Sequence, residues 1–187
     1  MLENYGFHNT KILNGGINGW NDIGGKITTE IAPIQGSNFT LPDVSPMTLY
    51  LNKEQMLTAI NDQTPPLIID TRTVNEYSGL RQKKGANSGG HIPGSILRDW
   101  ADCVNYNGDK KFKDYETLTA MYDSIIPNKE QPIIAYCHSG VRSALTTFVL
   151  TELLGYHNVK NYDGSWTEWS QFENYPKKQD SITTIFK

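Results

Sequence analysis

The sequence predicts an α/β protein in which helices cover both faces of a parallel sheet. From residue 47 onward, short apolar segments typical of strands alternate with segments of helical periodicity. This alternation requires crossover connections, so neighbouring strands run parallel and the sheet is buried on both faces. Hydrophobic residues make up 37% of the 187-residue chain, which is enough to build the core of such a fold.

Local signals define the expected elements. Asn52 is a suitable helix N-cap residue, Pro127 cannot continue a helix, and Gly155 can end one. Strands are predicted at 48–50, 67–70, 132–136 and 158–162, and helices at 53–61, 117–126 and 142–154. A tryptophan-rich helical segment follows the last strand. The apolar stripe of the 142–154 helix consists of Leu145, Phe148, Val149 and Leu153.

Two segments of the chain resemble each other. Residues 6–20 (GFHNTKILNGGINGW) align without gaps with residues 155–169 (GYHNVKNYDGSWTEW), and the identical residues include His8 with His157 and Trp20 with Trp169. We therefore expect residues 1–29 to be the C-terminal remnant of a preceding domain. The segment 30–46 is rich in Pro, Gly, Ser and Thr and is expected to be a linker. The main domain then covers residues 47–187.

Charge and composition exclude several classes of protein. The chain has 17 basic and 20 acidic residues, a formal net charge of −3. Nucleic-acid and anionic-membrane partners need a basic surface, so neither is expected. No apolar run approaches the roughly 18–20 residues that span a bilayer, and no signal peptide is visible. With two cysteines and no export signal, we expect free thiols and a cytoplasmic location.

Cys137 lies where an active site is expected in such a fold. It directly follows the predicted strand 132–136, and the next helix starts about five residues later. Gly140 can adopt a positive φ, so the short loop can direct successive backbone N–H groups inward as an anion-binding nest. The helix N-terminus and Arg142 add positive charge, and all three features should lower the pKa of Cys137. The alternative is a buried structural cysteine.

The spacing between the cysteine and the arginine limits the ligand. Cys137 and Arg142 form a Cys-x4-Arg loop, a tight cradle sized for one sulfur atom carried on the cysteine. Cysteine phosphatases and arsenate reductases of related shape use Cys-x5-Arg, which wraps a tetrahedral oxyanion. Ser143 occupies that next position here, which counts against phosphoryl chemistry.

Four motifs resemble those of the rhodanese family, specifically the tandem-domain thiosulfate and 3-mercaptopyruvate sulfurtransferases. They are IIDTRTVNEYSG (68–79), GGHIPGSI (89–96), the cysteine loop with its flanking strand and helix, and DGSW (163–166). They occur in the family's order over residues 48–172, and residues 1–27 look like the end of the inactive N-terminal domain. The resemblance implies a rhodanese-like domain with a parallel sheet of about five strands.

The resemblance also implies a reaction. The Cys137 thiolate takes a sulfur atom from a small anionic donor, becomes a persulfide, and passes the sulfur to cyanide, a thiol or a dithiol. No cofactor or metal is needed. The implied substrate-binding residues are those of the loop, with Arg142 holding the donor's negative charge: His138, Ser139, Gly140, Val141, Arg142 and Ser143.

Donor preference and alternative functions follow from single positions. Arg142 replaces the usual threonine of the mercaptopyruvate enzymes, so thiosulfate is the favoured donor. Glu76 stands where several two-domain members have a substrate-binding arginine. A non-catalytic binding module of the same fold and a cysteine phosphatase are the alternatives. The preceding domain is mostly missing, so we expect the surface that would face it to be exposed and the chain to be able to self-associate.

Other noticeable residues have structural interpretations. Asp70 and Arg72 are expected to form a buried or half-buried ion pair that braces the loop, and His91 to be a hydrogen-bonded structural residue. Cys103 follows two aspartates, which disfavour a thiolate, and is interpreted as a bystander. His8 and His157 are interpreted as scaffold residues, and Trp100, Trp166 and Trp169 as core or pocket wall. The basic loop, which carries Arg81, Lys83 and Lys84, is expected to be solvated and could attract anions. His138 is expected to be an exposed residue of the cysteine loop.

Overall fold

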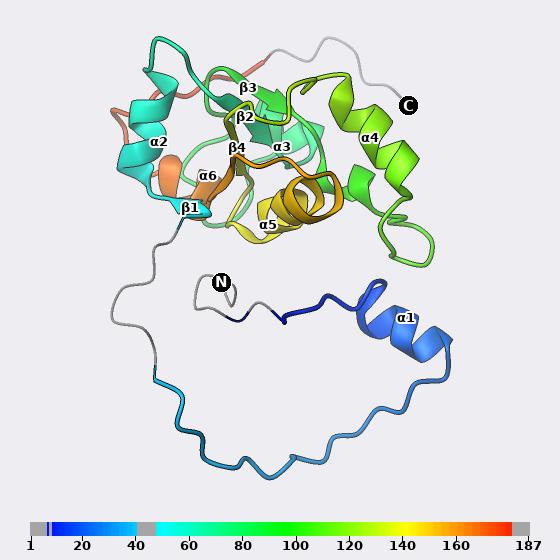
Figure 1. Ribbon diagram of the computed structural model, residues 1–187. Helices are drawn as coiled ribbons and strands as arrows, with labels where there is room; N and C mark the ends of the chain where they lie inside the picture. The colour runs from blue at the N-terminus through cyan, green and yellow to red at the C-terminus, as the bar shows by residue number, and fades with distance from the viewer. Residues whose placement is uncertain (1–6, 8, 41–47, 181–187) are drawn as a thin grey trace.

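The computed structural model describes residue 7 and residues 9–40 and 48–180, so His8 and the expected domain start at residue 47 lie outside the described residues. Its centre is a five-stranded sheet in the order β1-β5-β4-β2-β3 (Figure 1). Every pair of neighbouring strands is parallel. The α/β fold predicted from the alternation of strands and helices is therefore confirmed. The strands are β1 (Tyr50–Leu51), β2 (Leu67–Asp70), β3 (Ser95–Leu97), β4 (Ile133–Tyr136) and β5 (Val159–Tyr162).

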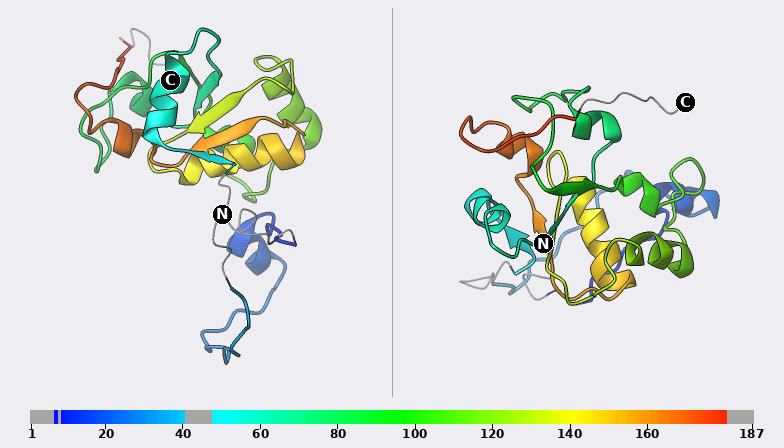
Figure 2. Two further views of the ribbon diagram at one scale, coloured as in Figure 1. Left: turned by 60° about the vertical axis from the view of Figure 1, so that its left-hand side comes forward. Right: turned by 90° about the horizontal axis from the view of Figure 1, so that it is seen from above.

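Helices pack on both faces of this sheet. The α-helices of this domain are α2 (Lys53–Ile60), α3 (Val74–Ser78), α4 (Tyr115–Asp123), α5 (Val141–Phe148) and α6 (Ser165–Trp169). One buried cluster joins α4 and the end of α5 to the sheet, and a second joins α2 and α6 to its other face. Figure 2 shows α2 and α5 on opposite sides of the strands. No helix among the described residues is long and apolar enough to cross a membrane.

The predicted boundaries agree with the structure wherever a local signal defines them. Asn52 caps α2 through a reciprocal pair of bonds with Gln55, which is the capping box. The predicted helix 117–126 begins earlier, because Asp114 caps α4 through the Thr117 amide. Strand β1 lies at residues 50–51 instead of 48–50, in register with Asn161 and Tyr162 of β5. Strand β3 was not predicted, since three residues are too short to show a period.

The apolar stripe expected on the 142–154 helix is confirmed in part: Val149 is fully buried, and Leu145 and Leu153 pack against the same core cluster. After α5 the chain continues as a π-helical segment, η3 (Val149–Leu153), in which the Leu154 amide donates to the Val149 carbonyl. Leu145, Phe148 and Leu153 are only half-buried; the buried residues of this stretch are Ser143, Thr146, Thr147, Val149, Leu150 and Leu154.

Among residues 7 and 9–40, which the structure describes before the sheet, there is one short helix, and it lies outside the sheet (Figure 1). Helix α1 spans Gly16–Asp22, and residues 24–40 contain no helix or strand. Helix α1 begins at Gly16 with φ 58°, and α6 begins at the repeat-equivalent Ser165 with φ 52°. The two segments therefore share an unusual backbone conformation as well as sequence.

Candidate active site

The Cys137 loop connects the C-terminal end of β4 to α5. Strand β4 is buried along its whole length in the centre of the sheet, which fixes Cys137 at the sheet edge where the strands end. Gly140 is the N-cap of α5 and has φ 80°. A Cβ atom at this position would lie 2.4 Å from Oδ1 of Asp163 and 2.8 Å from its carbonyl oxygen. Only glycine therefore fits this turn without displacing the segment after β5.

Ser165 holds both ends of the turn. Its Oγ accepts hydrogen bonds from the amides of Cys137 and Gly140, each at 3.0 Å, and donates one to the Tyr162 carbonyl at 2.8 Å. Two loop amides are thus bound by a serine and do not face the sulfur atom. Our sequence reasoning missed Ser165, although it belongs to the DGSW motif and to the repeat.

The remaining polar groups of the loop favour a thiolate at Cys137. Burial opposes ionisation of this thiol, which is 1% exposed. Hydrogen bonding from the Ser143 hydroxyl and from the amides of Ser143 and Ser139 outweighs burial, with Arg142 adding positive charge, so that the pKa of Cys137 is lowered. The direction of this shift is the one expected from the sequence. The Ser143 hydroxyl also donates to the Gly140 carbonyl at 3.0 Å, and the side chains of Ser139 and Val141 are exposed.

Arg142 is paired with Glu76, a contact that the sequence did not reveal. Its two terminal nitrogens each donate to one oxygen of the Glu76 carboxylate at 2.8 Å. Burial alone would raise the pKa of Glu76, but the Arg142 guanidinium lowers it to about 2. Arg142 also interacts with Cys137. The guanidinium that was expected to hold the donor's negative charge is therefore paired with a carboxylate, which occupies two of its five N–H groups.

The predicted exposure of His138 is wrong. The side chain is 7% exposed and lies under the loop that carries Lys84, whose carbonyl oxygen is 3.0 Å from Nε2. Burial lowers the pKa of His138, so the ring is neutral at pH 7, and Nε2 carries the proton that Lys84 accepts. The buried Nδ1 has no partner within the described part of the chain. This contact holds the basic loop against His138, the residue that follows Cys137.

The expected buried ion pair is confirmed. Asp70 and Arg72 are 0% and 1% exposed, and Nη2 of Arg72 lies 2.6 Å from Oδ2 of Asp70. Arg72 also donates to the Gly90 carbonyl at 2.7 Å and lies 4.7 Å from the ring of Trp166. His91 is buried, stacks on Tyr77 and bonds its carbonyl, as expected for a structural histidine. Trp166 and Trp169 belong to the core.

Cys103 is unsuited to nucleophilic chemistry. It is fully buried, with its sulfur 3.2 Å from the Tyr122 hydroxyl. Burial raises the pKa of Cys103 to about 11, and Asp102 adds to the shift. The bystander interpretation is therefore supported. Within residues 9–40 and 48–180 no group of three His, Cys, Asp or Glu side chains is arranged to hold a metal ion.

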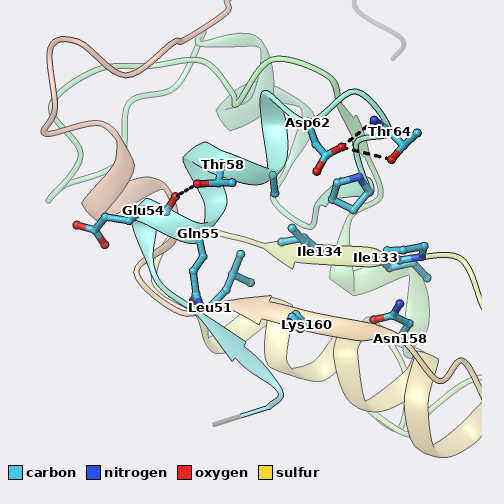
Figure 3. Close-up of a pocket in the computed structure, with 13 residues that line it drawn as sticks. Leu51, Glu54, Gln55, Thr58, Asp62, Thr64, Ile133, Ile134, Asn158 and Lys160 are labelled. Atoms are coloured by element: carbon cyan, nitrogen blue, oxygen red, sulfur yellow. Dashed lines mark hydrogen bonds between the residues drawn. The ribbon is translucent and has the colours of Figure 1, made fainter. Parts of the chain in front are cut away.

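Two cavities lie on different sides of the domain. One of about 280 Å³ is lined by Arg142, Glu76 and the basic loop. The larger, of about 520 Å³, lies between α2 and the N-terminal ends of β4 and β5, with Ile133 and Lys160 in its wall (Figure 3). Because Cys137 follows the opposite end of β4, the larger cavity is not part of the cysteine site.

The fold and site together define a class: a parallel α/β domain with an activated cysteine in the short loop between a central strand and a helix. The sequence profile of the rhodanese-like domain matches residues 52–172. The chain belongs to the rhodanese-like domain family.

Relatives agree with this assignment. The chain is 34% identical over 179 residues to the sulfur carrier protein TtuD of Thermus thermophilus, covering 91% of this chain and 62% of TtuD. It is 31% identical over 182 residues to the thiosulfate sulfurtransferase of Corynebacterium glutamicum, covering 94% and 59%. The chain thus spans about three-fifths of these relatives. The wild-type structure of EanB has a TM-score of 0.81 at 22% identity, covering 95% of this chain and 43% of EanB, and shares the fold.

Proposed function

We propose that the protein is a sulfurtransferase that moves a sulfur atom through a persulfide on Cys137. The observation that carries the proposal is the loop itself: a cysteine at the end of a central strand whose pKa is lowered by Ser143, by two backbone amides and by Arg142. The same groups suit the terminal sulfur anion of a persulfide, because they supply N–H and O–H donors from a preorganised turn. The relatives named above support this class of activity.

The proposed cycle has two displacements. The Cys137 thiolate attacks the outer sulfur of thiosulfate, a new S–S bond forms, and sulfite leaves with the electron pair of the broken bond. Cyanide or a thiolate then attacks the outer sulfur of the persulfide. The bond to Cys137 breaks, and its electron pair restores the thiolate. The cycle needs no oxidant and gives ping-pong kinetics.

Thiosulfate is the donor we favour over 3-mercaptopyruvate. Arg142 stands where the mercaptopyruvate enzymes that the sequence resembles have a threonine, and its guanidinium interacts with Cys137. Glu76 occupies two of its N–H groups, and the remaining ones can donate to the oxygens of thiosulfate.

We also propose that residues 1–29 correspond to the end of a preceding rhodanese-like domain, joined by 30–46 to the domain at 47–187. Helix α1 begins at the position equivalent to the start of α6. Side chains that are buried in the second copy are exposed in the first. The pairs are Phe7 (41%) and Tyr156 (1%), Leu13 (55%) and Tyr162 (0%), Ile17 (61%) and Trp166 (2%), and Trp20 (38%) and Trp169 (0%).

Mass spectrometry after thiosulfate treatment tests the proposed function. We expect the intact protein to gain one sulfur atom, peptide mapping to locate it on Cys137, and cyanide to release it as thiocyanate. Cys103 serves as the internal control because its raised pKa keeps it a thiol. A protein that gains no sulfur would contradict the proposal and favour a binding module. Turnover of an aryl phosphate without sulfur transfer would favour a phosphatase.

The variant Gly140→Ala tests the geometry of the loop. The new Cβ would collide with Asp163 and would require a positive φ, so we expect kcat/KM for sulfur transfer to fall by about a hundredfold. Gly155→Ala is the matched control: it has φ 70° but no atom within 4 Å of the added Cβ. It should lose stability but keep its activity. Equal activity of the two variants would show that the turn at Gly140 is not required.

A further inference from the structure

The carboxylate of Glu76 is held in place by its own helix. Glu76 is the third residue of α3, and its Oε2 accepts hydrogen bonds from the Thr73 hydroxyl at 2.9 Å and from the Thr73 amide at 3.4 Å. These bonds belong to the capping box of α3. The Glu76 side chain is 3% exposed, whereas most glutamates lie at the surface. The helix cap therefore fixes a carboxylate at a position that water hardly reaches.

The Arg142 guanidinium connects this carboxylate to the reactive sulfur. Its Nη1 and Nη2 atoms donate to Oε2 and Oε1 of Glu76, each at 2.8 Å. The guanidinium also interacts with Cys137, and its charge helps to lower the pKa of that thiol. The charge of Glu76 therefore reaches the cysteine site through Arg142.

The other charges near this pair are placed differently. Asp99, the N-cap of the 3₁₀ turn η2 (Trp100–Cys103), lies within range of the charges of Glu76 and Arg142. Its carboxylate accepts from the Ala101 amide at 3.1 Å, and no ion pair joins it to Arg142 in the described part of the chain. The remaining titratable or charged groups near the pair are the buried Arg72, the neutral ring of His138 and Lys83 of the basic loop. Glu76 is therefore the acidic group that contacts Arg142 directly.

The pair of Glu76 and Arg142 presents no net charge to a bound anion. Arg142 carries one positive charge, and Glu76 carries one negative charge because its pKa is lowered to about 2. Thiosulfate is doubly charged, so a carboxylate beside it opposes its binding. The same repulsion acts on the sulfite that leaves after the first displacement. Since it acts before and after the bond breaks, it should change binding more than the chemical step.

We propose that Glu76 is a specificity-determining residue that lowers the affinity of the cysteine site for doubly charged anions. It compensates the charge of Arg142 and leaves other N–H groups of the guanidinium available to the anion. The donor is then bound without a net positive charge, and sulfite is released readily once the sulfur has moved. This inference rests on the proposed function, because the anions concerned are the proposed donor and its product.

Alkylation of Cys137 by iodoacetamide tests this role without sulfur transfer. Iodoacetamide is uncharged, and sulfate is a doubly charged anion that donates no sulfur. At constant ionic strength, the sulfate concentration that halves the alkylation rate should fall about tenfold in Glu76→Gln. In Glu76→Asp, which keeps the charge, it should stay within about threefold of the wild-type value. An unchanged value in Glu76→Gln, a value for Glu76→Asp equal to that for Glu76→Gln, or no protection by sulfate in any of the proteins would overturn the proposal.

The glutamine variant keeps the local structure. Gln55 occupies the equivalent position in the capping box of α2 and accepts from the Asn52 amide at 2.9 Å, so a glutamine can also cap α3. Glu116, an exposed residue in the first turn of α4, gives the matched control Glu116→Gln, which removes one negative charge outside the site. Its half-protecting sulfate concentration should equal that of the wild type. A fall as large as that in Glu76→Gln would overturn the proposal.

The pH dependence of alkylation separates a charge effect from a merely structural role. Removing the negative charge of Glu76 lets the charge of Arg142 act fully on the thiolate, so the pKa of Cys137 should fall in Glu76→Gln. If Glu76 served only to hold the guanidinium in place, its loss would raise the pKa of Cys137. A raised or unchanged pKa of Cys137 would overturn the proposal.

Steady-state kinetics separate this inference from the proposed function. With thiosulfate and cyanide, Glu76→Gln should lower the KM for thiosulfate and the inhibition constant of sulfite by about tenfold each, with kcat within about threefold of the wild type. Equal constants in the two proteins would overturn the role of Glu76 even if sulfur is transferred. A wild type and variants that show the expected protection by sulfate but form no persulfide would overturn only the proposed function.

Discussion

Cys137→Ser is expected to lower thiocyanate formation from thiosulfate and cyanide by at least about a thousandfold, the scale of losing a catalytic nucleophile. A serine hydroxyl is not ionised near neutral pH, so the loop would surround a neutral group that neither attacks the donor nor stores the sulfur. In the native protein the loop lowers the pKa of the Cys137 thiol, and the variant removes the thiol on which the loop acts. Initial rates at saturating thiosulfate measure the effect.

The second cysteine of the chain provides the control for this variant. Cys103 is fully buried and its pKa is raised to about 11, so Cys103→Ser removes a thiol that is not ionised at neutral pH. The introduced hydroxyl can keep the contact with Tyr122. We expect kcat within about twofold of the wild type. Wild-type rates in Cys137→Ser, or a loss of activity confined to Cys103→Ser, would show that Cys137 is not the nucleophile.

The cysteine loop could be predicted because its signals are adjacent in the sequence. A buried strand, Cys137, Gly140 and the start of a helix follow one another within ten residues, so local geometry alone places the thiol at the sheet edge. The direction of the pKa shift follows from the same neighbours, because backbone amides and the nearby Arg142 act on the sulfur directly.

The contacts that complete the site could not be predicted, because they join distant segments. Glu76 reaches Arg142 across 66 positions, and Ser165 reaches Cys137 across 28. Both depend on the order of strands in the sheet, which places β2 and β5 on either side of β4. The burial of His138 has the same origin, since the Lys84 segment and the start of α6 cover it only in the folded chain.

Asp70→Ala is expected to lower the free energy of unfolding by about 3–5 kcal/mol, the scale of breaking a buried ion pair. Both partners are almost fully buried, so the guanidinium of Arg72 would lose its counter-charge in a place that water does not reach. The backbone amide of Arg72 would also lose its bond to Oδ1 of Asp70. Chemical denaturation measures the change, and the melting temperature should fall by roughly 6–20 °C.

A double variant separates charge burial from the loss of packing. Asp70→Asn/Arg72→Met removes both charges while keeping most of the side-chain volume, so no uncompensated charge stays in the core. Its free energy of unfolding should exceed that of Asp70→Ala, although Arg72→Met gives up the bond to Gly90 and the contact with Trp166. If the double variant were the less stable of the two, the bonds made by Arg72 would outweigh the cost of its unpaired charge. The pair would then stabilise the domain through those bonds, and Asp70 would serve chiefly to orient the guanidinium.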